Sequence, residues 1–293
     1  MTPFSIALVL ISAFIHSSWN FFIKRGNWPL QFYFWVFLGG TLFFLPFFFI
    51  LSDFPALLFR APSQFWYLSM VSGLIQTVYF VCLIEAYRVG DLSIVYPVSR
   101  SAPLFTLIWA VLFIGEVPSV KGVIGIGLVT LGIYVSSMKD FHLKNAISHS
   151  EHLTSRHYLL AFISAMGGSV YSIIDKIALR FVHPAIYTWL IDLCMCIYIG
   201  AYLLLRNVDS FLRVWKEFKR EIFIIVIMQN VAYLLALMAL QMSKVSYVVA
   251  FLQVSALFAA GMGVLLLKES QWKNRMTGAL ILTLGLVLIG LAK

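Results

Sequence analysis

Long apolar runs alternate with short polar connections along the chain. Ten of these runs reach helical length, and each is bounded by a charged residue, a proline or a glycine. Crossing a bilayer takes about 20 apolar residues, and in lipid the backbone must satisfy its own hydrogen bonds, as an α-helix does. The pattern therefore predicts ten transmembrane helices, over residues 3–23, 30–51, 64–87, 92–114, 121–138, 157–181, 185–205, 220–241, 245–267 and 274–292.

The composition is that of a membrane protein. Of the 293 residues, 61% are hydrophobic and 11% are charged, and the mean hydropathy is +0.94, whereas a soluble domain carries about 25% charged residues. Ten spans use about 200 residues, which leaves no room for a soluble catalytic or nucleic-acid-binding domain. We therefore predict an all-α integral membrane protein, multi-pass in the cytoplasmic (inner) membrane, whose partners include the lipid bilayer and exclude nucleic acid.

The net charge of +9 arises from Lys and Arg side chains that lie mainly between the apolar runs. This distribution signals membrane topology, because cytoplasmic connections carry the excess of positive charge. With the connection between the fifth and sixth spans placed in the cytoplasm, fourteen basic residues lie on that side and six on the other. The charges thus favour both termini outside.

The chain also divides into two similar halves. The longest polar stretch, 139–156, separates a first half, 1–138, from a second half, 157–293. An offset of 153 residues superposes like residues of the two halves, among them Gln76 on Gln229, Glu116 on Glu269, Gly125 on Gly278 and Gly132 on Gly285. With five spans per half, the second half enters the membrane from the opposite side, so we predict two inverted five-helix repeats. This architecture recurs among secondary transporters, whose substrate site lies near the midplane.

One block occurs in both halves. In the first half a proline-interrupted helix ends in Gly115-Glu116 and is followed by a glycine-rich helix; the second half has Glu269 at the corresponding point. On this block the chain resembles EamA-type transporters of the drug/metabolite transporter superfamily, over essentially its whole length. The resemblance implies a ten-helix secondary transporter. It also implies both termini in the cytoplasm, the opposite of what the charges favour.

The first span carries a polar stripe. His16, Asn20 and Lys24 recur at helical spacing, with Trp19 beside them, and are similar to the first helix of EamA-type members associated with phosphonate utilisation. Polar side chains in a membrane helix face the bundle interior, so we expect His16, Trp19 and Asn20 to line a substrate site. An imidazole titrates near physiological pH, which makes His16 a candidate for carrying a coupling proton. A hydrogen bond to a neighbouring helix is the alternative.

Arg100 is the leading candidate for binding substrate. It lies about 12 Å along its helix, near the middle of the hydrocarbon core, between Pro97 and Pro103. An arginine at this depth is costly unless it faces a cavity or a partner, and its guanidinium fork suits a carboxylate, phosphate or phosphonate. The alternative is a structural ion pair with Asp192 or Glu85. The repeat partner of Arg100 is Gln253, so a site between the halves would be asymmetric.

Further polar and aromatic residues recur in both halves. Gln76 and Gln229 are equivalent, and they are accompanied by Tyr79, Asn230 and Tyr233. Amide and aromatic side chains can bind a solute by hydrogen bonding and stacking, although hydrogen bonds between helices also explain them. We expect Tyr96, four residues before Arg100, to form part of the same wall.

Two acidic residues lie well inside the predicted spans of the second half. Asp175 is near the end of the sixth span, and Asp192 lies about 10 Å into the seventh. With Glu85 they are candidates either for a coupling ion, such as a proton, or for ion pairs.

Taken together, these features predict a secondary active transporter that moves a small polar or anionic metabolite, such as an amino acid, by alternating access. The alternative is a carrier of lipid-linked intermediates or an accessory membrane subunit. Nucleotide-binding, metal-binding and hydrolase motifs are absent from the sequence, so we expect no catalytic residue, cofactor or metal. Monomer and homodimer, import and export, remain open alternatives.

Overall fold

The structure, a computed structural model, describes residues 1–24, 28–50, 60–89, 92–137, 156–206, 210–258 and 272–292. This part of the chain is helical, with no strand in it. Its helices are α1 (Pro3–Lys24), α2 (Leu30–Ile50), α4 (Ser63–Val89), α5 (Leu92–Ser99), α6 (Ala102–Trp109), the π-helix η1 (Ala110–Ile114), α7 (Val120–Ser137), α9 (Arg156–Ala178), α10 (Pro184–Leu205), α11 (Phe211–Met242), α12 (Val245–Phe251) and α14 (Trp272–Gly290).

Six stretches of the described residues are long and apolar enough to cross a membrane. They are Ser63–Arg88, Val95–Ile114, Val120–Ser137, Arg156–Ala178, Pro184–Leu205 and Phe211–Met242. Four further apolar helices are shorter, namely Pro3–Trp19, Leu30–Pro46, Val245–Phe258 and Asn274–Gly290. The described part of the chain is therefore all-helical, and by length and composition its helices are those of a multi-pass membrane protein.

Two helices differ from their predicted course. α11 begins at Phe211, well before the expected start at 220, and its backbone is non-helical at Phe218. The kink at Phe218 lies two residues before the expected start at 220, so the apolar run marked the segment that follows the kink. The charged residues before that point interrupt the apolar run but are good helix formers, and they form a separate helical segment.

The predicted helix over 92–114 is not continuous. α5 ends at Ser99, Arg100 and Ser101 form a turn, and α6 begins at Ala102. Pro103 lies in the first turn of α6, where its missing N–H costs nothing because that group has no intrahelical partner. Pro97 lies inside α5 and Pro103 lies at the start of α6, so the two prolines flank the break at which Arg100 lies.

The second half is interrupted at the equivalent place. α12 ends at Phe251, and Leu252 and Gln253 form a turn before the chain becomes helical again over 254–258. Here the backbone forms hydrogen bonds between residues three apart, as in a 3₁₀-helix: Gln253 N donates to Ala250 O at 3.2 Å, and Ala256 N donates to Gln253 O at 2.9 Å. Prolines accompany the break in the first half only.

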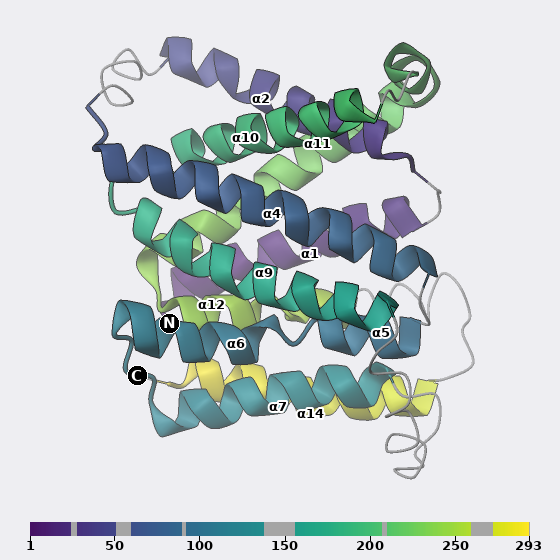
Figure 1. Cartoon of the computed structure of the whole chain (residues 1–293). Helices are drawn as coiled ribbons and strands as arrows, with labels where there is room; N and C mark the ends of the chain where they lie inside the picture. Colours follow the sequence, from purple (N-terminus) through teal and green to yellow (C-terminus); the bar gives the residue numbers. More distant parts are fainter. Residues whose placement is uncertain are drawn as a thin grey trace.

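Helices pair across the two halves (Figure 1). α7 lies against α14, α4 against α9, α1 against α11, and α2 against α10. The partners run antiparallel: in the pair α1 and α11, Ser12 donates to Ala232 O at 2.7 Å while Ser243 donates to Ser5 near the opposite ends. Exchanging the two halves maps the pair α1 with α11 onto α9 with α4, so the contacts respect the sequence repeat.

Glycines hold α7 and α14 in close contact. A Cβ added at Gly125 would lie 2.8 Å from Gly285 O, and one added at Gly285 would lie 2.6 Å from Gly125 O. Gly132 and Gly278 show the same reciprocity, at 2.7 and 2.5 Å. Small residues permit such backbone approach between membrane helices. The offset of 153 relates Gly125 to Gly278 and Gly132 to Gly285, so exchanging the two halves turns one glycine pair into the other.

Gly132→Ala is expected to lower the free energy of unfolding by about 1–3 kcal/mol. The new methyl group would meet backbone atoms, Leu282 N at 2.6 Å and Gly278 O at 2.7 Å, which cannot rotate away. Gly127→Ala on the same helix is the matched control, since nothing lies within 4 Å of its Cβ and alanine is the better helix former. Thermal unfolding of the purified protein measures both; equal changes in Tm would contradict the close contact.

Candidate functional site

A cavity of about 1820 Å³ lies between the two halves. Its deep end is bordered by Asp175 and Leu240, and its lining continues to Arg88, Ser137 and Arg156 at the ends of α4, α7 and α9. Because Arg88 is a surface residue, with 64% of its side chain exposed, the cavity reaches the molecular surface at this end of the bundle. A cavity of this size has room for a metabolite-sized solute.

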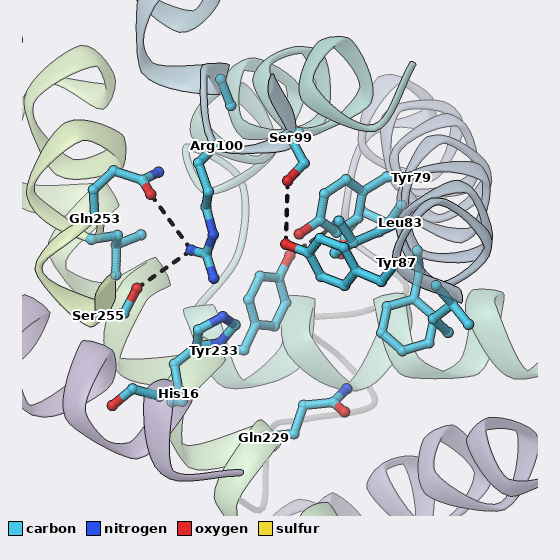
Figure 2. Close-up of a pocket in the computed structure, with 18 of the residues that line it drawn as sticks. His16, Tyr79, Leu83, Tyr87, Ser99, Arg100, Gln229, Tyr233, Gln253 and Ser255 are labelled. Atoms are coloured by element: carbon cyan, nitrogen blue, oxygen red, sulfur yellow. Dashed lines mark hydrogen bonds between the residues drawn. The ribbon is translucent and has the colours of Figure 1, made fainter. Parts of the chain in front are cut away.

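Arg100 projects into the cavity from the break between α5 and α6 (Figure 2). Its Nη1 donates to Gln253 Oε1 at 3.5 Å and to Ser255 Oγ at 3.4 Å, and its guanidinium lies 5.4 Å from the centre of the Tyr96 ring. Gln253 is the repeat partner of Arg100, so the two interrupted helices present equivalent residues to each other.

Arg100 has no carboxylate within salt-bridge distance among the described residues. An ion pair of Arg100 with Asp192 or Glu85 is therefore not formed. Glu85 instead lies 3.4 Å from Arg88 at the mouth of the cavity, and Asp192 faces Gly40 of α2. The guanidinium is held by neutral oxygens, which leaves its charge available to an anionic group.

Asp175 is the centre of a second polar cluster. Its Oδ1 accepts hydrogen bonds from Ser72 Oγ at 2.6 Å, Tyr187 OH at 2.6 Å and Gln76 Nε2 at 3.4 Å, and its Oδ2 accepts one from Tyr233 OH at 2.8 Å. Asp175 is 1% exposed, although it borders the deep end of the cavity. Four helices, α4, α9, α10 and α11, meet at this carboxyl group.

The remaining predicted residues divide between the cavity and its surroundings. His16, Trp19, Gln76, Tyr79, Tyr96, Gln229, Tyr233 and Gln253 line it. The rings of His16 and Trp19 lie edge to face at 5.1 Å, and Tyr79 contacts Tyr171 at 5.4 Å. Asn230 is buried outside the lining. The side chain of Asn20 lies outside the described residues.

Sequence reasoning missed several lining residues, including Tyr87, Tyr171 and Ser255. One signal pointed to Tyr171: with Gly168, Ser172 and Asp175 it forms a helical stripe of small and polar residues on α9. The signal for Ser255 was its position, two residues after Gln253, the repeat partner of Arg100. Within the described residues, no group of three or more His, Cys, Asp or Glu side chains is placed to hold a metal ion.

The end of the bundle opposite the cavity mouth is closed. Gly115 adopts φ +70 and ends η1, which turns Glu116 toward the start of α12. Glu116 accepts hydrogen bonds from Val245 N at 2.6 Å, Ser246 N at 3.3 Å and Ser246 Oγ at 2.7 Å. Lys176 Nζ donates to Leu240 O at 2.6 Å and Ser243 O at 2.9 Å, at the end of α11.

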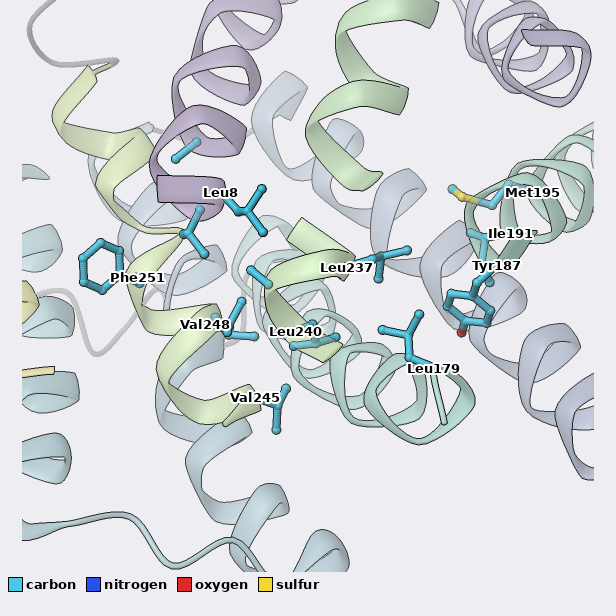
Figure 3. Packing of buried hydrophobic residues seen from close by; sticks show 14 of the residues in the cluster. Leu8, Leu179, Tyr187, Ile191, Met195, Leu237, Leu240, Val245, Val248 and Phe251 are labelled. Atoms are coloured by element: carbon cyan, nitrogen blue, oxygen red, sulfur yellow. The ribbon is translucent and has the colours of Figure 1, made fainter. Parts of the chain in front are cut away.

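Apolar packing lies beneath these hydrogen bonds. Leu179, Leu240 and Val245 are buried at the junction of α11 and α12, and the cluster continues along α10 and α12 to Ile191 and Phe251 (Figure 3). The carboxylate cap, the lysine and the apolar cluster together separate the deep end of the cavity from this surface.

Comparison with known proteins identifies the family. The model of the EamA-like transporter family matches residues 3–138 and again residues 155–291. No curated protein sequence matches the chain. A solved structure described as "Crystal structure of protein" shares the fold, with a TM-score of 0.74 and 13% identity over 99% of this chain and 98% of that one. The predicted membership of the phosphonate-associated subset stays a prediction. Because the two matches cover nearly the whole chain, the protein belongs to the EamA-like transporter family of the drug/metabolite transporter superfamily and is a membrane transporter.

Proposed function

We propose that the protein is a secondary transporter of the cytoplasmic membrane that moves a small anionic or zwitterionic metabolite, such as an amino acid, by alternating access. The observation that carries the proposal is the guanidinium of Arg100, which projects into the cavity and, among the described residues, is held by neutral oxygens. A charge within the membrane is costly and is retained where it binds or moves a solute.

Two charged residues of the cavity, Arg100 and Asp175, favour a particular solute. Arg100 offers a fork of donors that fits a carboxylate, phosphate or phosphonate group. The carboxyl group of Asp175 lies at the deep end, where its negative charge favours an ammonium group. Tyr79, Tyr96 and Tyr233 supply aromatic walls between them. A zwitterion can satisfy both poles at once.

The helix arrangement supports the transport mechanism. We infer that the four shorter apolar helices complete a ten-span chain with the six longer ones. Antiparallel contacts between equivalent helices, as at the glycine pairs of α7 and α14, are those expected of inverted repeats. Helices interrupted at Arg100 and Gln253 resemble the discontinuous helices at which transporters bind their substrates.

Alternating access also requires a closed end that can open. Glu116→Gln removes one carboxylate oxygen and places an N–H₂ group against the backbone donors of α12. Charge-assisted hydrogen bonds are about twice as strong as neutral ones, so we expect the closed state to lose about 1–2 kcal/mol. Ser119 lies just before α7 at this end and contacts the hydroxyl group of Tyr247 on α12. A cysteine introduced there, with the native cysteines replaced by alanine, should react with an impermeant thiol reagent about 5- to 30-fold faster in Glu116→Gln.

The control for this prediction is Glu217→Gln, which removes a carboxylate from the exposed face of α11. It should leave the labelling rate unchanged. If Glu116→Gln also leaves the rate unchanged, the carboxylate cap does not hold this end closed.

Binding measurements test the proposed solute class. Purified protein is screened by thermal shift against amino acids, their esters, the corresponding amines, phosphonates and nucleobases, since a bound ligand raises the apparent Tm by mass action. We expect zwitterions to raise the Tm, and their esters, which lack the anionic group, to lose the effect. A response to nucleobases or amines with none to any anionic compound would contradict the assignment of Arg100.

A further inference from the structure

A third buried polar site lies between α2, α10 and α11. Asp192 is 3% exposed and Asn230 is 1% exposed. Asn230 Nδ2 donates to Val226 O at 2.9 Å. Asp192 Oδ2 and Asn230 Oδ1, however, are both buried without a hydrogen-bond partner in the described structure. Two neighbouring acceptor oxygens are thus left unsatisfied, which is rare in protein interiors.

Gly40 makes room for this site. A Cβ added at Gly40 would overlap Asp192 Oδ2 and would lie 2.7 Å from Asn230 Nδ2. The carboxyl group therefore sits directly against the backbone of α2, with the amide of Asn230 beside it. Any larger residue at position 40 would displace both side chains.

No positive charge balances Asp192 among the described residues. α2 brings Gly40 and α11 brings Asn230, neither of which titrates. Among the described residues, the titratable group that interacts with Asp192 is the thiol of Cys196, one turn along α10. An isolated carboxylate without water or a counter-charge is one of the most costly groups to bury in a protein.

We propose that Asp192 is a proton-binding site of the transporter. A proton on Oδ2 removes the buried charge and converts an oxygen that can only accept into a donor. It also needs no volume, whereas a metal ion requires a cage of several oxygen ligands. Because Oδ2 lies against Gly40, the site has no space for such a cage on that side.

The site communicates with the substrate cavity in two ways. Asp192 is among the residues that line the cavity, so protons can reach it from the open end. α11 carries Asn230 against Asp192 and, one turn later, Tyr233, which donates to Asp175. A role in coupling proton movement to transport rests on the proposed function, whereas proton binding itself does not.

Infrared spectroscopy of the full chain in lipid tests proton binding directly, with the proton itself as the probe. At pH 7 the wild type should show the carbonyl stretch of a protonated carboxylic acid, which shifts on exchange into D₂O. Asp192→Asn should abolish this band, and Asp175→Asn, the control, should retain it. A band that survives in Asp192→Asn, or is absent from the wild type, overturns the proposal.

Two further measurements keep the test decisive. Should Asp192→Asn fail to fold, Asn230→Ala replaces it. The protonated Oδ2 is expected to donate to the unpartnered Oδ1 of Asn230, so loss of that acceptor should move the band to the higher frequency of a carboxyl group with fewer hydrogen bonds, and an unmoved band rejects the site. Thermal unfolding is also compared in sodium chloride and choline chloride. Equal Tm values are expected; a Tm raised by sodium in the wild type but not in Asp192→Asn would assign the site to a sodium ion and overturn the proton assignment.

Discussion

Arg100→Gln is expected to reduce transport at least about 100-fold while the protein remains folded. The loss corresponds to about 2.7 kcal/mol, the range of a hydrogen bond to a charged group. Glutamine keeps a side chain that can bond to Gln253 and Ser255, which now hold Arg100 at 3.5 and 3.4 Å, but it removes the positive charge. The measurement is uptake of the best-binding solute into proteoliposomes, with thermal unfolding as the test of folding.

The matched control is Arg88→Gln, which removes an arginine from the mouth of the same cavity. Arg88 is 64% exposed and pairs with Glu85 on the surface, so its loss should change transport less than about threefold, as expected of a screened surface charge. Arg100→Lys keeps the charge without the fork and should fall between the two. Full activity of Arg100→Gln would reject the assignment of the anionic-group ligand.

Asp175→Ala is expected to have the largest effect on stability, a loss of about 4 kcal/mol in the free energy of unfolding. Removing the carboxyl group leaves the hydroxyl groups of Ser72, Tyr187 and Tyr233 buried without their acceptor, and each unsatisfied group costs about 1–3 kcal/mol. The corresponding fall in Tm is on the order of 10 °C. Thermal unfolding followed by intrinsic fluorescence measures it.

Milder substitutions in the same cluster distinguish the loss of hydrogen bonds from a general loss of core packing. Asp175→Asn keeps one acceptor oxygen and should lose about half as much stability. Tyr187→Phe and Tyr233→Phe each delete one hydrogen bond at a cost of about 1 kcal/mol. If Asp175→Ala unfolds at the wild-type temperature, the cluster does not join the four helices as described.

Much of the helical framework could be read from the sequence, because a membrane imposes one rule on every span. Apolar runs marked α1, α2 and α4 to within a residue or two, since lipid tolerates neither charge nor unpaired backbone there. The offset of 153 also predicted that Arg100 and Gln253 are equivalent, and the hydrogen bond between them follows that equivalence.

What the sequence could not give are the contacts that depend on three or four helices meeting. Asp175 was an acidic residue near a helix end, and nothing local indicates that Ser72, Tyr187 and Tyr233 converge on it from three other helices. No proline near Gln253 indicates in the sequence that the helix is interrupted there. The place of Asp192 depends on Gly40, more than 150 positions away, and only the folded chain brings them together.

The contact between Arg100 and Gln253 has a consequence for how such a chain can evolve. A gene that has just been duplicated encodes the same residue at both positions, and here those positions face each other. Two arginines would confront one another in a low-dielectric interior and repel. The ancestral copies therefore had to diverge at this point before one strong charge could occupy the meeting place of the halves.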